Sequence, residues 1–245
     1  MAVLWIGLTP AGVPGKLWGI GYSVCHQIES HSYMFNGMQL PLCSRCTGLF
    51  LGALSTIVIL STQKRRGGFP RIPFRWILLA FFLAYLVDGI NSTLSLFAGS
   101  YSLYEPTNLV RLISGMLMGI TLGVLLLSLW NQILWKEPDA SPLLNSFRLL
   151  GACTAVGGLI VLLVVSGLPF LYYPLAVLST GSVVLMLAMV YTLLWTLVLK
   201  RENSLGRWHE RAWIFLLGGL SAMIQIALMD ALRFGLTHSW AGFAI

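Results

Sequence analysis

Charged residues are scarce in this sequence, and their scarcity excludes most soluble folds. Only 9% of the 245 residues are charged, whereas 57% are hydrophobic. A soluble domain usually carries about 25% charged residues, which let water solvate its surface. Lipid rather than water must therefore surround most of this chain. Because one span needs roughly 20 apolar residues, the chain has room for about six spans joined by short loops.

Long polar domains, low-complexity tracts and clear repeats are absent as well. No stretch alternates basic and aromatic residues, so the net charge of +7 does not indicate nucleic-acid binding, and we expect none. The apolar start, Met1 to Leu8, lacks the charged residues that open a signal peptide and is too short to span. We expect this N-terminal segment to lie at the membrane interface.

Six long apolar runs predict transmembrane helices. Their approximate ranges are 40–60, 74–97, 108–130, 147–168, a run that ends at 199, and 212–234. Backbone groups in lipid must be satisfied within the segment, which favours helices, and the runs are too long for barrel strands. The sequence predicts an all-α integral membrane protein, with a bundle of about six helices in one domain over 1–245. Gly115-x-x-x-Gly119 and Gly119-x-x-x-Gly123 predict close helix packing.

The basic residues divide unequally between the two faces of this predicted bundle. Eleven of the 15 fall on one face and four on the other. Short loops rich in lysine and arginine stay in the cytoplasm, so we expect the larger set inside and both termini outside. The larger set is Lys64, Arg65, Arg66, Arg71, Arg75, Lys136, Arg148, Lys200, Arg201, Arg207 and Arg211.

Three of the four cysteines and two of the four histidines lie between residues 25 and 48, on the predicted outer face. Cys43 and Cys46 form a C-x-x-C pair at the start of the first span. Two thiols at this spacing bind one metal ion or form a reversible disulfide. With Cys25 and His26 they supply three sulfurs and one nitrogen, a set that matches a tetrahedral zinc site. His31 is the alternative fourth ligand.

Two other interpretations of these cysteines stay open. The outer face of a membrane is often oxidising, so a disulfide competes with the metal. The thiols are alternatively buried without a role. The fourth cysteine, Cys153, lies deep in the fourth predicted span without a partner in sequence, and we expect it to be a core residue.

Five charged residues fall inside the predicted spans or beside the cysteines. A charge in hydrocarbon costs several kcal/mol, so these side chains should face the bundle interior and pair. We expect them to form one polar cluster beneath the Cys/His site. Three roles of this cluster stay open: it fixes the register of the helices, supports the metal ligands, or forms a small binding pocket. The five residues are Arg45, Asp88, Arg111, Asp230 and Arg233.

These motifs together resemble a known family. It is an uncharacterised prokaryotic family of multispanning membrane proteins, domain of unknown function 2085. The resemblance covers residues 20–125 and leaves three further helices, over 147–235, outside it. It implies a multispanning architecture without an established activity, and we expect a prokaryotic plasma membrane. The motifs that carry it are Cys25-His26-Gln27, Leu42-Cys43-Ser44-Arg45-Cys46-Thr47-Gly48, Asp88, and Thr107-Asn108-x-x-Arg111-x-x-x-Gly115-x-x-x-Gly119.

Three functions compete on these observations. The first is non-enzymatic: a zinc-stabilised module that contacts the lipid bilayer and serves as an accessory subunit beside other membrane subunits. The second is a membrane thiol–disulfide oxidoreductase, with Cys43 and Cys46 as the redox pair, Cys25 exchanging with them and Arg45 stabilising the thiolate. The third is a transporter of small molecules or ions. It would use a polar pocket formed by Asp88, Arg111, Asp230 and Arg233.

Overall fold

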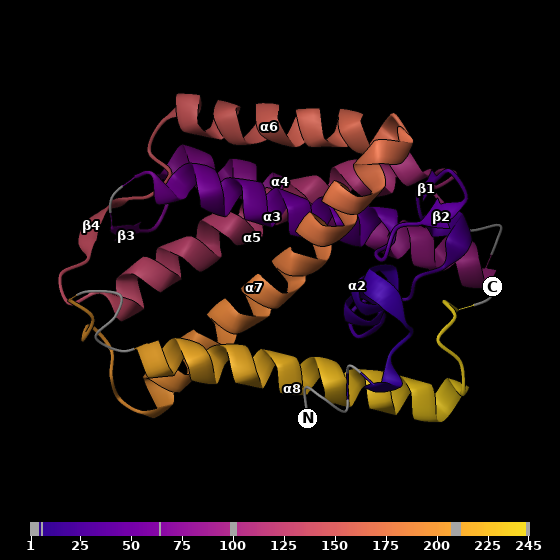
Figure 1. The fold of residues 1–245 in the computed structure, drawn as a ribbon. Coiled ribbons are helices and arrows are strands. Elements are labelled where there is room, and N and C mark those ends of the chain that lie inside the picture. Colours follow the sequence, from indigo (N-terminus) through magenta and orange to yellow (C-terminus); the bar gives the residue numbers. More distant parts are fainter. Residues whose placement is uncertain (1–4, 6, 64, 99–101, 207–211, 244–245) are drawn as a thin grey trace.

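Six long helices dominate the computed structural model, which describes residues 5, 7–63, 65–98, 102–206 and 212–243 (Figure 1). Each is long and apolar enough to cross a membrane. The predicted all-α membrane architecture is confirmed, and the helix ends lie within four residues of the predicted ones. The helices are α3 (Ser44–Ser61), α4 (Ile72–Ala98), α5 (Asn108–Leu134), α6 (Phe147–Val165), α7 (Tyr172–Val198) and α8 (Ala212–Thr237).

Short elements gather at one end of the bundle. They are the helix α2 (Gly12–Tyr22), the 3-10 turn η1 (Glu29–His31), and a hairpin of β1 (Met34–Phe35) and β2 (Met38–Gln39). Asn36 and Gly37 link these strands with φ of 49° and 79°. Positive φ at both central residues makes a type I′ turn, whose twist suits a two-residue hairpin loop. This end carries the cysteines.

The opposite end carries β3 (Arg66–Gly68) and β4 (Asp139–Pro142), which pair in parallel (Figure 1). Several predictions fall outside the described residues. These are positions 1–4 and 6 of the predicted interfacial segment, and Lys64, Arg207 and Arg211 of the predicted basic loops.

α3 and α5 pack most closely, and glycines permit the approach. A Cβ atom added at Gly115 would lie 2.1 Å from the Arg45 carbonyl oxygen, and one at Gly119 would lie 2.2 Å from that of Leu49. Neither distance is possible for a real side chain, so only glycine lets the two backbones touch. The predicted small-residue packing is confirmed for this pair.

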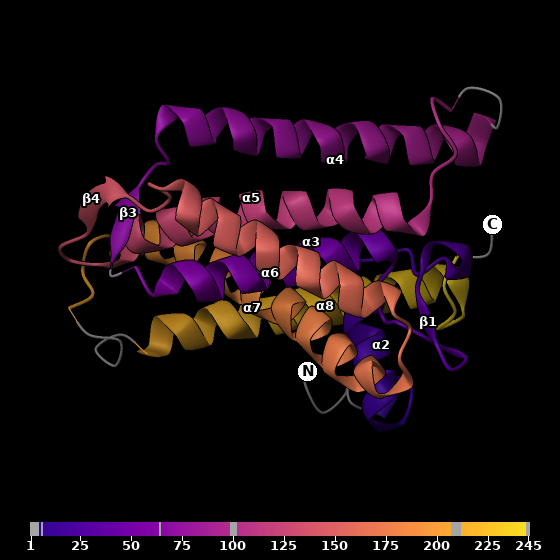
Figure 2. The ribbon, with the colours of Figure 1, turned by 90° about the horizontal axis from the view of Figure 1, so that it is seen from above.

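The remaining helices surround this pair. α4 lies along α5, α6 packs on α3, and α7 crosses obliquely to meet α8 (Figures 1 and 2). Cys153 of α6 is buried in the main apolar cluster, which confirms the prediction that it is a core residue. Many leucines and valines of α4, α6, α7 and α8 are exposed, which suits helices that face lipid.

Candidate functional site

Three cysteines converge where α2 leads into α3. Cys25 follows α2 in a turn that its N–H closes by donating to the Gly21 carbonyl (2.9 Å). Cys43 is the N-cap residue of α3, and Cys46 lies in the first turn. Their Sγ atoms all lie within 4.8 Å of one another. Cys25 and Cys43 are buried and Cys46 is half-buried. These three residues are called the cysteine cluster below.

The surroundings of Cys25 favour its thiolate form. Its Sγ accepts the backbone N–H of Cys43 at 3.2 Å and that of Gln27 at 3.5 Å. Hydrogen bonds from the Cys43 and Cys46 side chains, and then these N–H groups, hold the pKa of Cys25 well below its usual range, although burial opposes them. The positive end of the α3 dipole acts in the same direction. A thiolate is both the nucleophile and the metal ligand form of cysteine.

The donor set fits a soft metal ion. Zinc–sulfur bonds of about 2.3 Å at tetrahedral angles place sulfurs about 3.8 Å apart. Sulfurs that already lie within 4.8 Å need only small rotamer changes to reach that spacing. Thiolates select Zn²⁺ or Cu⁺ over Mg²⁺ or Ca²⁺. The three cysteines could therefore supply three ligands to one such metal ion.

The two candidate histidines lie next to the cluster but are engaged elsewhere. His26 Nδ1 accepts the Ile28 N–H at 3.0 Å. His31 Nε2 lies 3.1 Å from Arg111 Nη2, and because arginine only donates, this nitrogen accepts. Among the described residues, the group with ligand atoms in mutual reach contains the three cysteines and neither histidine. Metal binding by either ring would break its present hydrogen bond.

Arg45, between two of the cysteines, connects the cluster to a buried carboxylate. Its Nη2 and Nε donate to Asp88 Oδ2 at 2.6 and 3.0 Å, and Nη2 also donates to Ser92 Oγ at 2.8 Å. Ser114 Oγ donates to Asp88 Oδ2, and Tyr104 donates to Oδ1, both at 2.8 Å. Both oxygens of Asp88 thus accept hydrogen bonds from protein donors.

Arg111 completes this network from α5. Its Nη1 donates to Asn108 Oδ1 at 3.1 Å, and its Nε approaches Ser92 Oγ at 3.4 Å. The contact with His31 links the network to the segment between Cys25 and Cys43. The structure therefore brings Arg45, Asp88 and Arg111 together around Ser92, next to the segment that carries the cysteines.

The structure places Asp230 and Arg233 elsewhere, on α8. Asp230 Oδ2 accepts the Trp5 indole N–H at 2.7 Å. Arg233 donates to the backbone carbonyls of Tyr22, Cys25 and His26 at 2.8, 2.5 and 3.1 Å. In the described part of the chain, neither residue forms an ion pair with a member of the network of Arg45, Asp88 and Arg111. Backbone carbonyls at the end of α2 take the place of the expected carboxylate partner of Arg233.

Sequence reasoning missed several neutral partners of these charges. Tyr104, Ser92 and Ser114 bond to Asp88 or Arg45, yet hydroxyl residues are too common to stand out. Gln27 is 1% exposed, has φ of 53°, and donates from Nε2 to the carbonyls of Trp18 (3.1 Å) and Pro41 (2.8 Å). Its place in the Cys-His-Gln motif was the available signal.

Residues 25–125 match the family described as "Predicted membrane protein (DUF2085)". The chain is also 30% identical over 111 residues to an uncharacterised protein of Methanothermobacter thermautotrophicus, which covers 45% of this chain and 91% of that protein. The chain belongs to this family. It is 26% identical over 121 residues to an uncharacterised protein of Methanocaldococcus jannaschii, covering 49% of this chain and 72% of that one. No solved structure matches the chain.

The DUF2085 match defines which part of the site belongs to the family. It starts at Cys25 and ends within α5, so it contains the whole cysteine cluster, Arg45, Asp88 and Arg111. The relative uncharacterised protein ycf20 of Aglaothamnion neglectum is 35% identical over 92 residues, or 38% of this chain and 78% of that protein. Arg233 lies outside the DUF2085 match, so α8 adds its contact with the Cys25 loop from beyond the family region.

Proposed function

We propose that the cysteine cluster binds a zinc ion that ties the N-terminal segment to the first span of this membrane protein. The observation that carries the proposal is the approach of three Sγ atoms to within 4.8 Å, with two backbone N–H groups directed at Cys25. Zinc in this position would join α2 to α3 through bonds that a buried trio of thiols alone does not provide.

The fourth ligand in this proposal is His26. Its ring adjoins Cys25, and binding would require it to give up the hydrogen bond from Ile28. His31 is the weaker choice because its Nε2 holds Arg111, a charge that would otherwise lose a buried partner. Replacing His26 by Ala should therefore lower zinc affinity more than replacing His31 does.

Metal analysis of the purified full-length protein, together with a free-thiol count, tests the proposal. We expect about one zinc per chain, with thiols that react only after chelation. Cys25→Ala, Cys43→Ala and Cys46→Ala should each abolish binding. Cys153→Ala is the matched control, because Cys153 is buried outside the cluster. This variant should retain the metal. Less than about half an equivalent of zinc with oxidised thiols would contradict the proposal.

The role that follows is structural: a metal-stabilised module that works as an accessory subunit of a membrane complex. Apolar side chains along α4 and α8 remain exposed to lipid or to helices of other subunits. Extraction in a mild detergent tests this role. An extracted particle whose mass exceeds that of one chain in its detergent micelle supports this role. A monomer under all extraction conditions opposes it.

A thiol–disulfide oxidoreductase is the second candidate, favoured by the contact of three thiols and the low pKa of Cys25. The Cys25 thiolate would attack a partner's disulfide, release one partner thiolate and form a mixed disulfide. Cys46 would displace the second partner sulfur and form a disulfide with Cys25. Cys43 would then attack the Cys46 sulfur and release the Cys25 thiolate, so that the redox pair Cys43–Cys46 ends oxidised and the partner gains two electrons and the two protons of these thiols. Cys46→Ser should trap the mixed disulfide, and failure to trap it counts against this function.

A further inference from the structure

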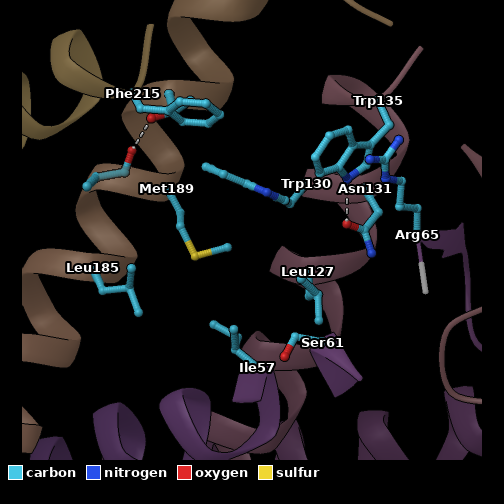
Figure 3. Close-up of a pocket in the computed structure, with 12 residues that line it drawn as sticks. Ile57, Ser61, Arg65, Leu127, Trp130, Asn131, Trp135, Leu185, Met189 and Phe215 are labelled. Atoms are coloured by element: carbon cyan, nitrogen blue, oxygen red, sulfur yellow. Dashed lines mark hydrogen bonds between the residues drawn. The ribbon is translucent and has the colours of Figure 1, made fainter. Parts of the chain in front are cut away.

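An apolar cavity of about 560 Å³ lies between α3, α5, α7 and α8, at the end of the bundle away from the cysteines. Figure 3 shows Ile57, Leu127, Met189 and Phe215 arranged around its open centre. Volumes of about 300–1,000 Å³ are typical of pockets that hold a small ligand. The cavity has no part in the zinc proposal, so it needs an explanation of its own.

Three polar side chains in the cavity wall already have hydrogen-bond partners within the protein. Ser61 Oγ donates to the Val58 carbonyl and Thr192 Oγ1 to the Ala188 carbonyl, each at 2.7 Å. Asn131 Oδ1 accepts the Trp135 indole N–H at 3.2 Å (Figure 3). Water in a cavity needs two to four polar partners. This wall offers mainly hydrocarbon, so an apolar chain suits the space better than water or a polar ligand.

One cation marks the mouth of the cavity. Arg65 lies in its lining, and the guanidinium carbon stands 3.8 Å from the centre of the Trp135 ring. The neighbouring Arg66 pairs with Asp139 at 3.7 Å, whereas no carboxylate of the described residues lies within ion-pair distance of Arg65. Stacking on the indole holds the exposed guanidinium in one place. Its planar fork matches the oxygens of a phosphate.

The depth of Arg65 agrees with the position of a lipid headgroup. α3 ends at Ser61, so Arg65 stands just where the span leaves the hydrocarbon. Basic residues at this depth attract anionic headgroups. The apolar space and the cation therefore occupy the relative positions of an acyl chain and its phosphate.

We propose that this cavity binds one acyl chain of an anionic phospholipid from the surrounding bilayer, with the lipid phosphate on Arg65. The acyl chain would fill the space between α5 and α7 that protein side chains leave open. Bound lipid would then bridge the α3–α5 pair to α7 and α8 at the end where the cysteine cluster does not reach.

A photoactivatable phosphatidic acid with a diazirine on its acyl chain tests this site in the full-length protein. We expect adducts on Ile57, Leu127, Met189 or Phe215 after digestion and mass spectrometry. Arg65→Ala should raise the half-saturating lipid concentration about tenfold, as loss of a charged hydrogen bond does. Met189→Trp should abolish these adducts by filling the cavity.

Matched controls separate the cavity from the general lipid surface. Arg71→Ala removes another exposed arginine that does not line the cavity, and Leu194→Trp enlarges an exposed side chain of α7. Both should leave the labelling unchanged.

Adducts confined to exposed residues, or cavity labelling that survives Met189→Trp, would overturn the site. Equal labelling by a diacylglycerol probe, with no effect of Arg65→Ala, would overturn the role of the phosphate. Because Arg65 is exposed, its variants keep the test valid if Met189→Trp does not fold.

Discussion

Asp88 illustrates how one buried charge is stabilised by several donors. Arg45, Ser114 and Tyr104 all hydrogen-bond to its carboxylate, which is 2% exposed as a residue. Burial, and then its bond to Asp88, raises the pKa of Tyr104 to about 12, so this phenol stays protonated and keeps donating. The carboxylate consequently keeps its phenol, hydroxyl and guanidinium partners, which suits a structural role.

Removing this charge should destabilise the protein strongly. Asp88→Asn leaves the half-buried Arg45 beside a neutral amide, and breaking a buried pair from one side costs about 3–5 kcal/mol. Asp139→Asn is the control, because its pair with Arg66 spans 3.7 Å at the surface and should contribute about 1 kcal/mol or less. Thermal unfolding in one detergent compares the two. Equal shifts of the midpoint would contradict the structural role of Asp88.

His31 should make stability depend on pH. Burial, then the positive charge of Arg111 and the proximity of His26, lower the pKa of His31 from 6.5 to about 4. The unfolded chain therefore binds a proton on this ring between these pH values while the folded protein does not. The contribution of His31 to stability is complete above pH 6.5 and is lost as the pH falls, by about 2 kcal/mol at pH 5 and about 3 kcal/mol at pH 4.

Unfolding midpoints of the wild type and His31→Gln at pH 7.5 and 5 measure this effect. The glutamine oxygen still accepts from Arg111 but does not titrate, so the variant should lose part of the pH dependence. Protonation of the cysteine ligands affects both proteins alike and cancels in the difference. Identical slopes for the two proteins would exclude His31 as a contributor.

The sequence indicated the important residues better than it indicated their partners. Charges in lipid must be compensated, so Arg45, Asp88 and Arg111 could be identified by residue type alone. The separate place of Arg233 could not, because it depends on where α8 lies against α2. Neither composition nor spacing specifies that packing, and backbone carbonyls leave no trace in the sequence as possible partners.

At the scale of elements, the contact of α3 with α5 should be the most sensitive to added volume. Gly115→Ala places a methyl group against the Arg45 carbonyl, and we expect a loss of about 1–3 kcal/mol or more. Gly158→Ala in α6 is the control, because nothing lies within 4 Å of its added Cβ. Alanine there should be neutral or stabilising by up to about 1 kcal/mol. Denaturation curves that rank the two variants in the opposite order would contradict this packing.

The helices were easier to predict than the short elements. Long apolar runs determine spans because lipid leaves the backbone few alternatives, which is why the six helix ends agree closely. The hairpin of β1 and β2 was missed, although Asn36-Gly37 is a strong signal for a type I′ turn. α2 was missed because Pro14 and several glycines weaken its helical signal, whereas contacts with α7 and α8 support it.

For the whole molecule, the distribution of basic residues predicts an orientation. We propose that the cysteine end faces outward and the end with β3 and β4 faces the cytoplasm. Glu105→Cys and Glu202→Cys introduce exposed thiols at the two ends. A membrane-impermeant maleimide should label the first in intact cells and the second only after permeabilisation. The reverse pattern would refute the orientation.

The contact of Arg233 with the Cys25 loop has a consequence for synthesis. The two residues are 208 positions apart, and at about 5–20 residues per second the ribosome needs roughly 10–40 s to travel between them. During that interval the Cys25 carbonyl lacks its guanidinium partner, so the loop that holds the Cys25 thiol is less constrained. Nascent chains would therefore meet metal or oxidant before α8 arrives. The redox conditions during those seconds, rather than those around the mature protein, would decide whether the folded protein holds its cysteines bound to metal or as a disulfide.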